Sequence, residues 1–140
     1  MCPPHKPPER RRRSQTMKQQ KTVEDYLKTI YILYRRSGLV RGVDVAEELS
    51  VSRATVSISL KGLEEEGYLF VDEAHGIHLT EKGRRIAEET YERYRTFQEL
   101  LEGLGVDKRT AGRDACRMEH AVSPESFQAL KGLAGKAKRE

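Results

Sequence analysis

The chain has 140 residues with a formal net charge of +4, two cysteines and no tryptophan, a length that suits one domain or two very small ones. No apolar run approaches the length of a membrane span, and the N-terminus lacks the apolar region of a secretory signal. Cys2 and Cys116 lie far apart, so a disulfide framework is not expected and a cytoplasmic location is favoured.

Residues 1–21 carry most of the positive charge. They contain seven Lys or Arg residues, one acid, four prolines and no hydrophobic periodicity, which predicts a disordered basic arm. Such an arm either contacts DNA phosphates or the minor groove or is a solvated tail, and Met17 would also offer a later start. The arm has a net charge of +6 and the whole chain one of +4, so residues 22–140 have a net charge of −2. The positive charge of the whole chain therefore does not by itself indicate nucleic-acid binding.

Ordered structure is expected from Thr22, which suits a helix N-cap followed by the acids Glu24 and Asp25 in the first turn. Ser37 and Gly38 are predicted to end this helix. Its apolar residues recur at helical spacing: Val23, Tyr26, Leu27, Ile30, Tyr31 and Tyr34.

Two shorter helices are predicted next. The first covers about residues 43–49, and a tight turn at Ser50 and Val51 leads to the second, which is capped by Ser52 and ends at Gly67. A short turn between two amphipathic helices is typical of a helix-turn-helix. The expected core residues of the pair are Val45, Ala46, Leu49, Val56, Leu60 and Leu63.

A β-hairpin is predicted after the third helix. Residues 68–71 and 77–79 are rich in β-forming side chains, and the turn region 72–76 separates them. His75 and His78 on this hairpin would contact phosphate, form a metal pair or, as is more common, simply be exposed. Helix, helix, turn, helix and hairpin is the order of a winged helix-turn-helix.

Three further helices are expected. Thr80 caps a long helix that stops at Gly105 and carries an apolar stripe suited to a dimer interface or to an internal core. Asp107 caps the next helix. Ser123, followed by Pro124 at the first helical position, begins the last one.

The third helix has a polar face suited to reading DNA. An arginine near its N-terminus and short hydroxyl side chains fit base edges in the major groove. The expected DNA-binding residues are Arg53, Ala54, Thr55, Ser57, Ser59 and Lys61. The alternative is a winged-helix module that binds protein, which would show no salt-dependent binding to any duplex.

The stretch DACRMEH, residues 114–120, contains a thiol, a carboxylate and an imidazole at Cys116, Glu119 and His120. On a helix, positions i, i+3 and i+4 share one face, so these side chains would point the same way. All three are competent metal ligands. The alternative is a solvated helix face with one buried thiol, which is common, and the spacing does not decide between the two interpretations.

Four stretches together resemble the diphtheria toxin repressor family of metal-dependent transcriptional regulators: TVEDYLKTIYIL, VAEELSVSRATVSISLKGLEEEGYL, LTEKGRRIA and DACRMEHAVS. Within the family, the chain is most like the short members such as the manganese transport regulators, which lack an SH3-like third domain. The resemblance covers residues 22–123. It implies a mainly α fold with a small β-hairpin. In that fold a winged helix-turn-helix over residues 22–80 precedes a helical metal-binding and dimerisation domain over residues 81–140. It also implies a homodimer that represses metal-uptake genes by binding a double-stranded DNA operator when Fe²⁺ or Mn²⁺ is present.

The same resemblance implies a primary metal site made of Asp25, Cys116, Glu119 and His120. The manganese branch usually has a second carboxylate where this chain has Lys28. The aspartate is like the manganese branch and the cysteine like the iron branch, and such a mixed donor set would also suit Zn²⁺ or Co²⁺. Tyr94 and Gln98 occupy the positions of a further family metal site, which is therefore expected to be weak or absent.

Other functions remain compatible with the sequence. In a regulator that has lost metal sensing, Asp25 would stabilise its helix N-terminus or pair with Lys28. A metalloenzyme would need an open coordination position and a general base. No base motif, phosphate loop or nucleophile triad is visible in the sequence, so neither catalysis nor a small-molecule substrate is expected.

Overall fold

The computed structural model describes the backbone of residues 7–139 and the side chains of residues 20–134. The described chain forms α1 (Pro7–Ser37), α2 (Gly42–Leu49), α3 (Arg53–Glu65), β1 (Leu69–Val71), β2 (Ile77–Leu79), α4 (Glu81–Gly103), α5 (Lys108–Met118) and α6 (Pro124–Arg139). It divides into two compact units, one ending at Ile86 and one beginning at Ala87. No helix among the described residues is both long and apolar enough to cross a membrane.

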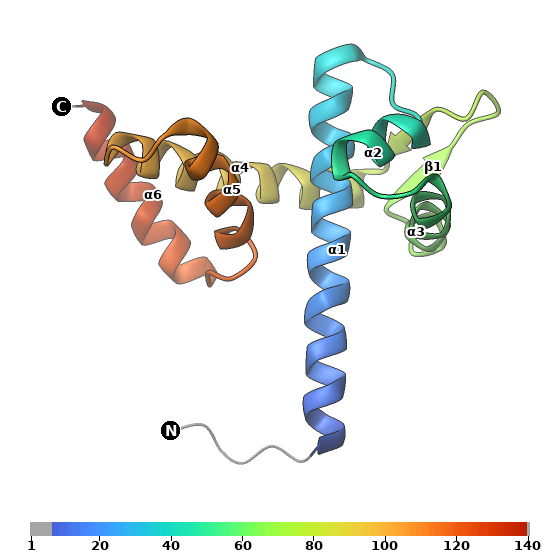
Figure 1. Cartoon of the computed structure of the whole chain (residues 1–140), viewed down its shortest axis with the longest axis horizontal. Helices are drawn as coiled ribbons and strands as arrows, with labels where there is room; N and C mark the ends of the chain where they lie inside the picture. The colour runs from blue at the N-terminus through green and yellow to red at the C-terminus, as the bar shows by residue number, and fades with distance from the viewer. Residues whose placement is uncertain (1–6, 140) are drawn as a thin grey trace. The chain divides into compact units, whose positions relative to one another are not determined.

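In the N-terminal unit, α1 packs against α2 and β2, and α3 packs against α2 and β1 (Figure 1). The backbone N–H of Ile77 donates to the carbonyl of Val40 at 2.8 Å, which joins the hairpin to the segment before α2. The predicted order of helices and hairpin is confirmed. The core of this unit consists of Tyr26, Leu27, Ile30, Leu33, Val40, Val45, Ala46, Val56, Leu63, Leu69 and Ile77.

The start of α1 differs from the prediction. The helix begins at Pro7, so the N-cap predicted at Thr22 is wrong, and the basic arm expected to be disordered over residues 1–21 is helical from Pro7 onward. Residues 1–6 of that arm lie outside the described residues. The physical reason is local: Glu, Arg, Gln and Lys dominate residues 9–21 and have high helix propensity, while Pro is tolerated in a first helical turn.

The turn between α2 and α3 fits a helix-turn-helix. Ser50 has a left-handed φ of 56° and caps the C-terminus of α2 through hydrogen bonds to the carbonyls of Ala46 and Glu47. The predicted N-cap at Ser52 is confirmed, because its Oγ accepts from the backbone N–H of Thr55 at 3.1 Å.

Asp72 holds the turn of the hairpin. Its Oδ1 accepts hydrogen bonds from the backbone N–H groups of Ala74 at 2.9 Å and Gly76 at 2.8 Å. Its Oδ2 lies 2.7 Å from His78 Nε2, and the His78 ring stacks on Phe70 with centroids 4.9 Å apart. The hydrogen bond from His78, followed by those from the two backbone groups, lowers the pKa of Asp72 below its ordinary value.

The first turn of α4 closes tightly on the hairpin. Thr80 Oγ1 accepts from the N–H of Gly83 at 3.2 Å, which confirms Thr80 as the cap. A Cβ on Gly83 would lie 2.0 Å from the carbonyl oxygen of Tyr68, so only glycine fits here. The division between the units falls inside α4, after Ile86, six residues beyond the boundary expected from the sequence.

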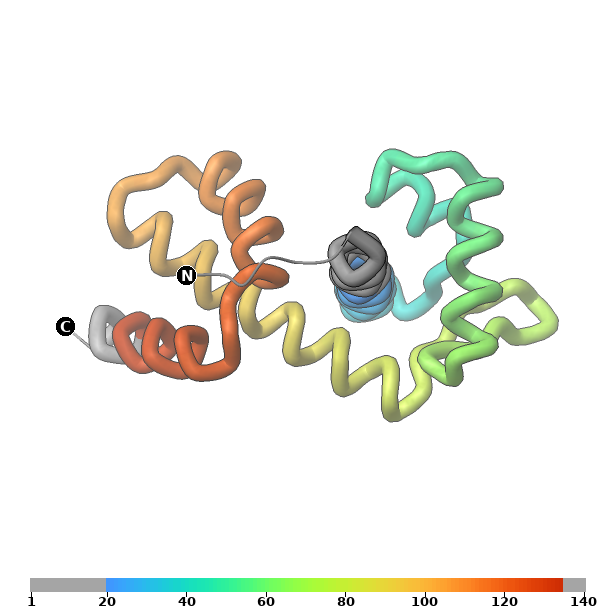
Figure 2. Tube along the Cα trace, turned by 90° about the horizontal axis from the view of Figure 1, so that it is seen from below, coloured from blue at the N-terminus to red at the C-terminus, as the bar shows by residue number. Residues whose placement is uncertain are grey.

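The C-terminal unit is a cluster of helices built from α4, α5 and α6 (Figure 2). Phe97 and Phe127 meet edge to face with centroids 5.9 Å apart, and Ala115 completes the buried centre. The predicted caps Asp107 and Ser123 are confirmed by hydrogen bonds of 3.1 and 3.2 Å to backbone N–H groups three residues later. Packing of a few large side chains around a small one lets α5 approach closely.

Candidate DNA interface and metal centre

The exposed side of α3 carries most of the predicted DNA-binding residues. Arg53, Ala54, Thr55, Ser57 and Lys61 are exposed, whereas Ser59 is half-buried because it lies towards the core side of the helix. Val56 and Leu63 anchor the opposite side in the core. A helix fixed along one side, with mostly polar side chains along the other, matches the reading helix of a helix-turn-helix.

A cavity of about 470 Å³ lies beside α3, between the start of α2 and the hairpin. Its lining includes the cations Arg41, Arg53 and Lys61, together with His75 and the acidic Glu64. The remaining lining is largely aliphatic and belongs to the core edge. Cationic side chains around a hollow next to an exposed helix suit a polyanion such as the DNA backbone.

The hairpin histidines differ from each other in setting. His75 is exposed and has a left-handed φ of 66°, whereas His78 is held by Asp72 and Phe70. Among the described side chains, neither histidine belongs to a group of three metal-competent residues. The contacts of His78 with Asp72 and Phe70 give this histidine a role in shaping the hairpin.

The DACRMEH stretch spans the end of α5 and the turn that follows. The helix ends at Met118, Glu119 is its C-cap, and His120 lies in the turn. The expectation that Cys116, Glu119 and His120 share one continuous helix face is therefore wrong for His120. The helical hydrogen bonding continues to Glu119, whose N–H donates to Ala115 at 3.0 Å, and then gives way to the turn.

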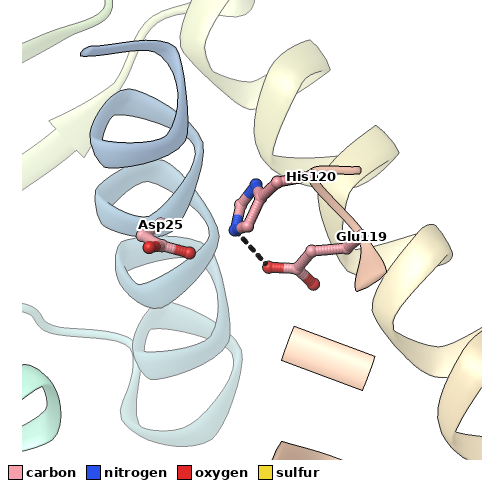
Figure 3. A group of neighbouring side chains, drawn as sticks. All are labelled: Asp25, Glu119 and His120. Atoms are coloured by element: carbon pink, nitrogen blue, oxygen red, sulfur yellow. Dashed lines mark ion pairs between the residues drawn. The ribbon is translucent and has the colours of Figure 1, made fainter. Parts of the chain in front are cut away.

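Glu119 and His120 nevertheless pair closely (Figure 3). Glu119 Oε1 and His120 Nε2 lie 3.1 Å apart, and the two side chains are 0% and 8% exposed. Two ligand atoms bonded to one ion at about 2.0–2.2 Å, with angles near 90–110°, are separated by about 2.8–3.6 Å. The pair therefore fits two neighbouring positions of a metal coordination shell as well as it fits an ordinary ion pair.

Arg93 of α4 fixes the backbone of this turn. Its Nη1 donates to the carbonyls of Glu119 at 3.3 Å and Val122 at 2.7 Å. Its guanidinium also lies over the Phe127 ring, 5.3 Å from the centroid. A turn tied to another helix by two charge-assisted bonds keeps its side chains in place. This role of Arg93 could not be predicted from the sequence, because its two partners lie 26 and 29 residues away along the chain.

The two other predicted ligands lie on helices. Asp25 is half-buried on α1 in the N-terminal unit, and its side chain is labelled in Figure 3. Cys116 is half-buried on α5 as a free thiol. Tyr94 and Gln98, at the positions of the further family site, face Gly112: a Cβ there would lie 3.3 Å from the Tyr94 hydroxyl and 3.5 Å from Gln98 Nε2. Both side chains thus pack between α4 and α5.

The chain matches two families along its length. Residues 18–77 match the family described as iron dependent repressor, N-terminal DNA binding domain. Residues 80–140 match iron dependent repressor, metal binding and dimerisation domain. The exposed face of α3 falls in the first match, and the turn with Glu119 and His120 falls in the second.

Two relatives illustrate the similarity in sequence. Transcriptional regulator MntR of Escherichia coli O6:H1 is 38% identical over 109 residues, which are 78% of this chain and 70% of that protein. An uncharacterized HTH-type transcriptional regulator of Methanocaldococcus jannaschii is 34% identical over 112 residues, which are 79% of this chain and 90% of that protein.

Solved structures show the same similarity. The manganese regulator SloR aligns with a TM-score of 0.71 at 32% identity, over 81% of this chain and 53% of that one. A manganese-dependent transcriptional repressor in complex with manganese aligns with a TM-score of 0.73 at 30% identity, over 81% of this chain and 52% of that one. This chain therefore spans about half the length of these two structures.

Proposed function

Because this chain belongs to the diphtheria toxin repressor family of metal-dependent DNA-binding transcriptional regulators, we propose that it represses metal-uptake genes when Mn²⁺ or Fe²⁺ is bound. It acts as a cytoplasmic homodimer on a double-stranded DNA operator. Residues 22–80 provide DNA binding, and residues 81–140 provide dimerisation and most of the metal ligands. Repression of uptake genes closes a feedback loop in which the metal limits its own import.

The proposed contacts with DNA come from the N-terminal unit. α3 enters the major groove, where exposed Arg53, Thr55 and Ser57 reach base edges. Arg41 and Lys61 beside the cavity bind phosphates and set the orientation of the helix. In a homodimer the two copies of α3 contact half-sites about one helical turn apart, so the operator is symmetric.

Asp25, Cys116, Glu119 and His120 are the proposed metal ligands. A thiolate, an imidazole and two carboxylates suit Mn²⁺ or Fe²⁺ and would also hold Zn²⁺ or Co²⁺. A bound cation supplies the charge that offsets repulsion between the carboxylates. Since the aspartate belongs to the DNA-binding unit, sharing one ion among these residues would couple the spacing of the reading helices to metal occupancy.

The observation that carries the metal-sensing proposal is the Glu119–His120 pair. The carboxylate and the imidazole are buried, and Glu119 Oε1 lies 3.1 Å from His120 Nε2. Arg93 holds the turn that carries them, and this turn lies within the residues that match a metal binding domain. Burying an ionised carboxylate is costly unless positive charge lies next to it. A bound cation would meet that requirement.

A second candidate function is a DNA-binding regulator that has lost metal sensing. Lys28 favours it, because this side chain is buried at 5% exposure, one helical turn after Asp25. An ammonium near a site opposes the binding of another cation. Measured metal affinity therefore separates the two candidates.

Calorimetric titration of Mn²⁺ tests the ligand set without DNA. His120→Ala should lower the affinity roughly tenfold or more, because changes at or around metal ligands commonly cost that much. His75→Asn is the matched control: it removes an imidazole from the hairpin while keeping a residue tolerant of its positive φ, and its affinity should equal that of the wild type. Unchanged affinity in His120→Ala would remove His120 from the site.

Fluorescence anisotropy on the duplex upstream of its own gene tests the coupling to DNA. At fixed salt, binding is measured with chelator and then with Mn²⁺, anaerobic Fe²⁺, Co²⁺ and Zn²⁺. At least one metal should tighten binding, and Arg53→Ala should weaken that complex while leaving metal affinity unchanged. Equal binding with chelator and with every metal would select the second candidate.

A further inference from the structure

Ile58 is an apolar side chain on the outer side of α3, with 75% of its surface exposed. It lies two residues after the buried Val56, so a helix that turns about 100° per residue directs it almost opposite the core. The residues of α3 predicted from the sequence to bind DNA do not include Ile58. The helical period was nevertheless a sufficient signal for its outward position.

The residues next to Ile58 on this face are small, so its side chain protrudes beyond them. Ala54 and Gly62, one turn before and after it, are exposed and small, and a Cβ added at Gly62 would meet nothing within 4 Å. Arg53 and Lys61 bring positive charge to the same helix. The face therefore presents one branched apolar group between small residues, with the cation Lys61 on the adjacent turn.

We propose that Ile58 determines operator specificity by packing its side chain against the 5-methyl group of a thymine in the major groove. The thymine methyl is the apolar group that base pairs present there, and apolar side chains recognise it by contact. Ile58 has no donor or acceptor, so it reads the methyl group by excluding water. The inference rests on the proposed function, because it requires α3 to bind DNA.

The surroundings favour DNA over a protein partner. A single exposed apolar residue is ordinary on a protein surface, and a protein-binding surface usually has a cluster of them at its centre. Ile58 is the one large apolar side chain of α3 that is strongly exposed, and Arg53, Thr55, Ser57 and Lys61 are exposed on the same helix. Positive charge on the helix that carries one apolar contact suits a polyanion that presents a methyl group.

The test removes the methyl group from the DNA and the side chain from the protein. Duplexes are first selected from a random-sequence pool by the wild-type protein with Mn²⁺. Each thymine of the selected duplex is then replaced singly by deoxyuridine. The wild type should lose about threefold to tenfold in affinity at one thymine per half-site, the size expected for one methyl group removed from water.

Ile58→Ser should bind the thymine and deoxyuridine duplexes equally at that position, whereas Ile58→Val should keep the wild-type preference. Ile and Ser have similar helix propensity, so the helix is retained. Leu39→Ser is the matched control, because Leu39 is 51% exposed in the same unit but outside α3; it should keep the full preference.

The outcomes separate this inference from the proposed function. If the wild type selects no duplex with Mn²⁺ or with the other metals, both fail together. If a selected duplex binds but no deoxyuridine position weakens it, or if Ile58→Ser keeps the wild-type preference, the inference alone is overturned and this face of α3 serves another partner.

Discussion

Asp72 shows how one exposed side chain organises a local structure. It accepts two backbone hydrogen bonds inside its own turn and pairs with His78 across the hairpin. All of these contacts are made best by the ionised carboxylate, because a protonated one is a poorer acceptor. The order of the hairpin tip is thereby linked to the ionisation of a single group.

Acid should loosen the hairpin tip. Since folding lowers the pKa of Asp72, its contribution to stability is present above about 3.9, the ordinary aspartate value, and is lost as the pH falls through the lower folded value. In an NMR titration, the amide signals of Ala74 and Gly76 should shift with a midpoint below about 3.9. Asp72→Asn should abolish that titration, and a midpoint at or above the ordinary value would contradict this account.

At the scale of elements, the junction between the hairpin and α4 requires a glycine at position 83, because there is no room for a Cβ. The first turn of α4 approaches the backbone of Tyr68 so closely at Gly83 that a methyl group would overlap it. Thr80 strengthens the same join, because it caps α4 and also donates to the carbonyl of Gly67 at 2.6 Å. Backbone contact and capping together set the direction in which α4 leaves the hairpin.

Gly83→Ala should destabilise the protein by about 1–3 kcal/mol, because the added methyl group forces backbone atoms apart. Gly62→Ala is the matched control: it also adds one methyl group to a helix, but meets nothing within 4 Å. It should leave stability unchanged or raise it by up to about 1 kcal/mol, through helix propensity. Urea denaturation of both variants measures the difference. Equal stabilities would show that the hairpin yields to the methyl group.

At the scale of the whole molecule, the proposed function divides between two units. The unit ending at Ile86 contains α3, which we propose reads DNA, and the unit beginning at Ala87 contains the turn with Glu119 and His120. The second unit also exposes Leu104 and Leu133, at 81% and 57%. Large apolar side chains left in water favour association, and the matched family describes this region as a dimerisation domain.

The protein should sediment with about twice its chain mass of 16.0 kDa at micromolar concentration, because closed two-fold dimers are the commonest oligomers. Sedimentation equilibrium at several concentrations measures this mass. Ile58→Ser is a suitable control, because it changes the other unit and should not alter association. A mass of one chain at every concentration would contradict the homodimer and with it the symmetric operator.

The sequence by itself determined the local features of this protein. The caps at Ser52, Thr80 and Asp107 follow from contacts three residues apart, and the pairing of the two strands joins residues six to ten positions apart. Residue type and spacing fix such contacts. The early start of α1 at Pro7 is also local, and the prediction missed it because prolines and arginines outweighed helix propensity.

Tertiary structure decided which of these local features make a site. Glu119 is buried, and Arg93 anchors its turn from 26 and 29 residues away. Gly83 must be glycine because of the backbone of Tyr68, 15 residues earlier. The end of α5 before His120 likewise sets the geometry of the pair with Glu119. No periodicity reaches across such distances. Burial and long-range hydrogen bonds arise when separate elements pack, and they depend on the shape of the whole core.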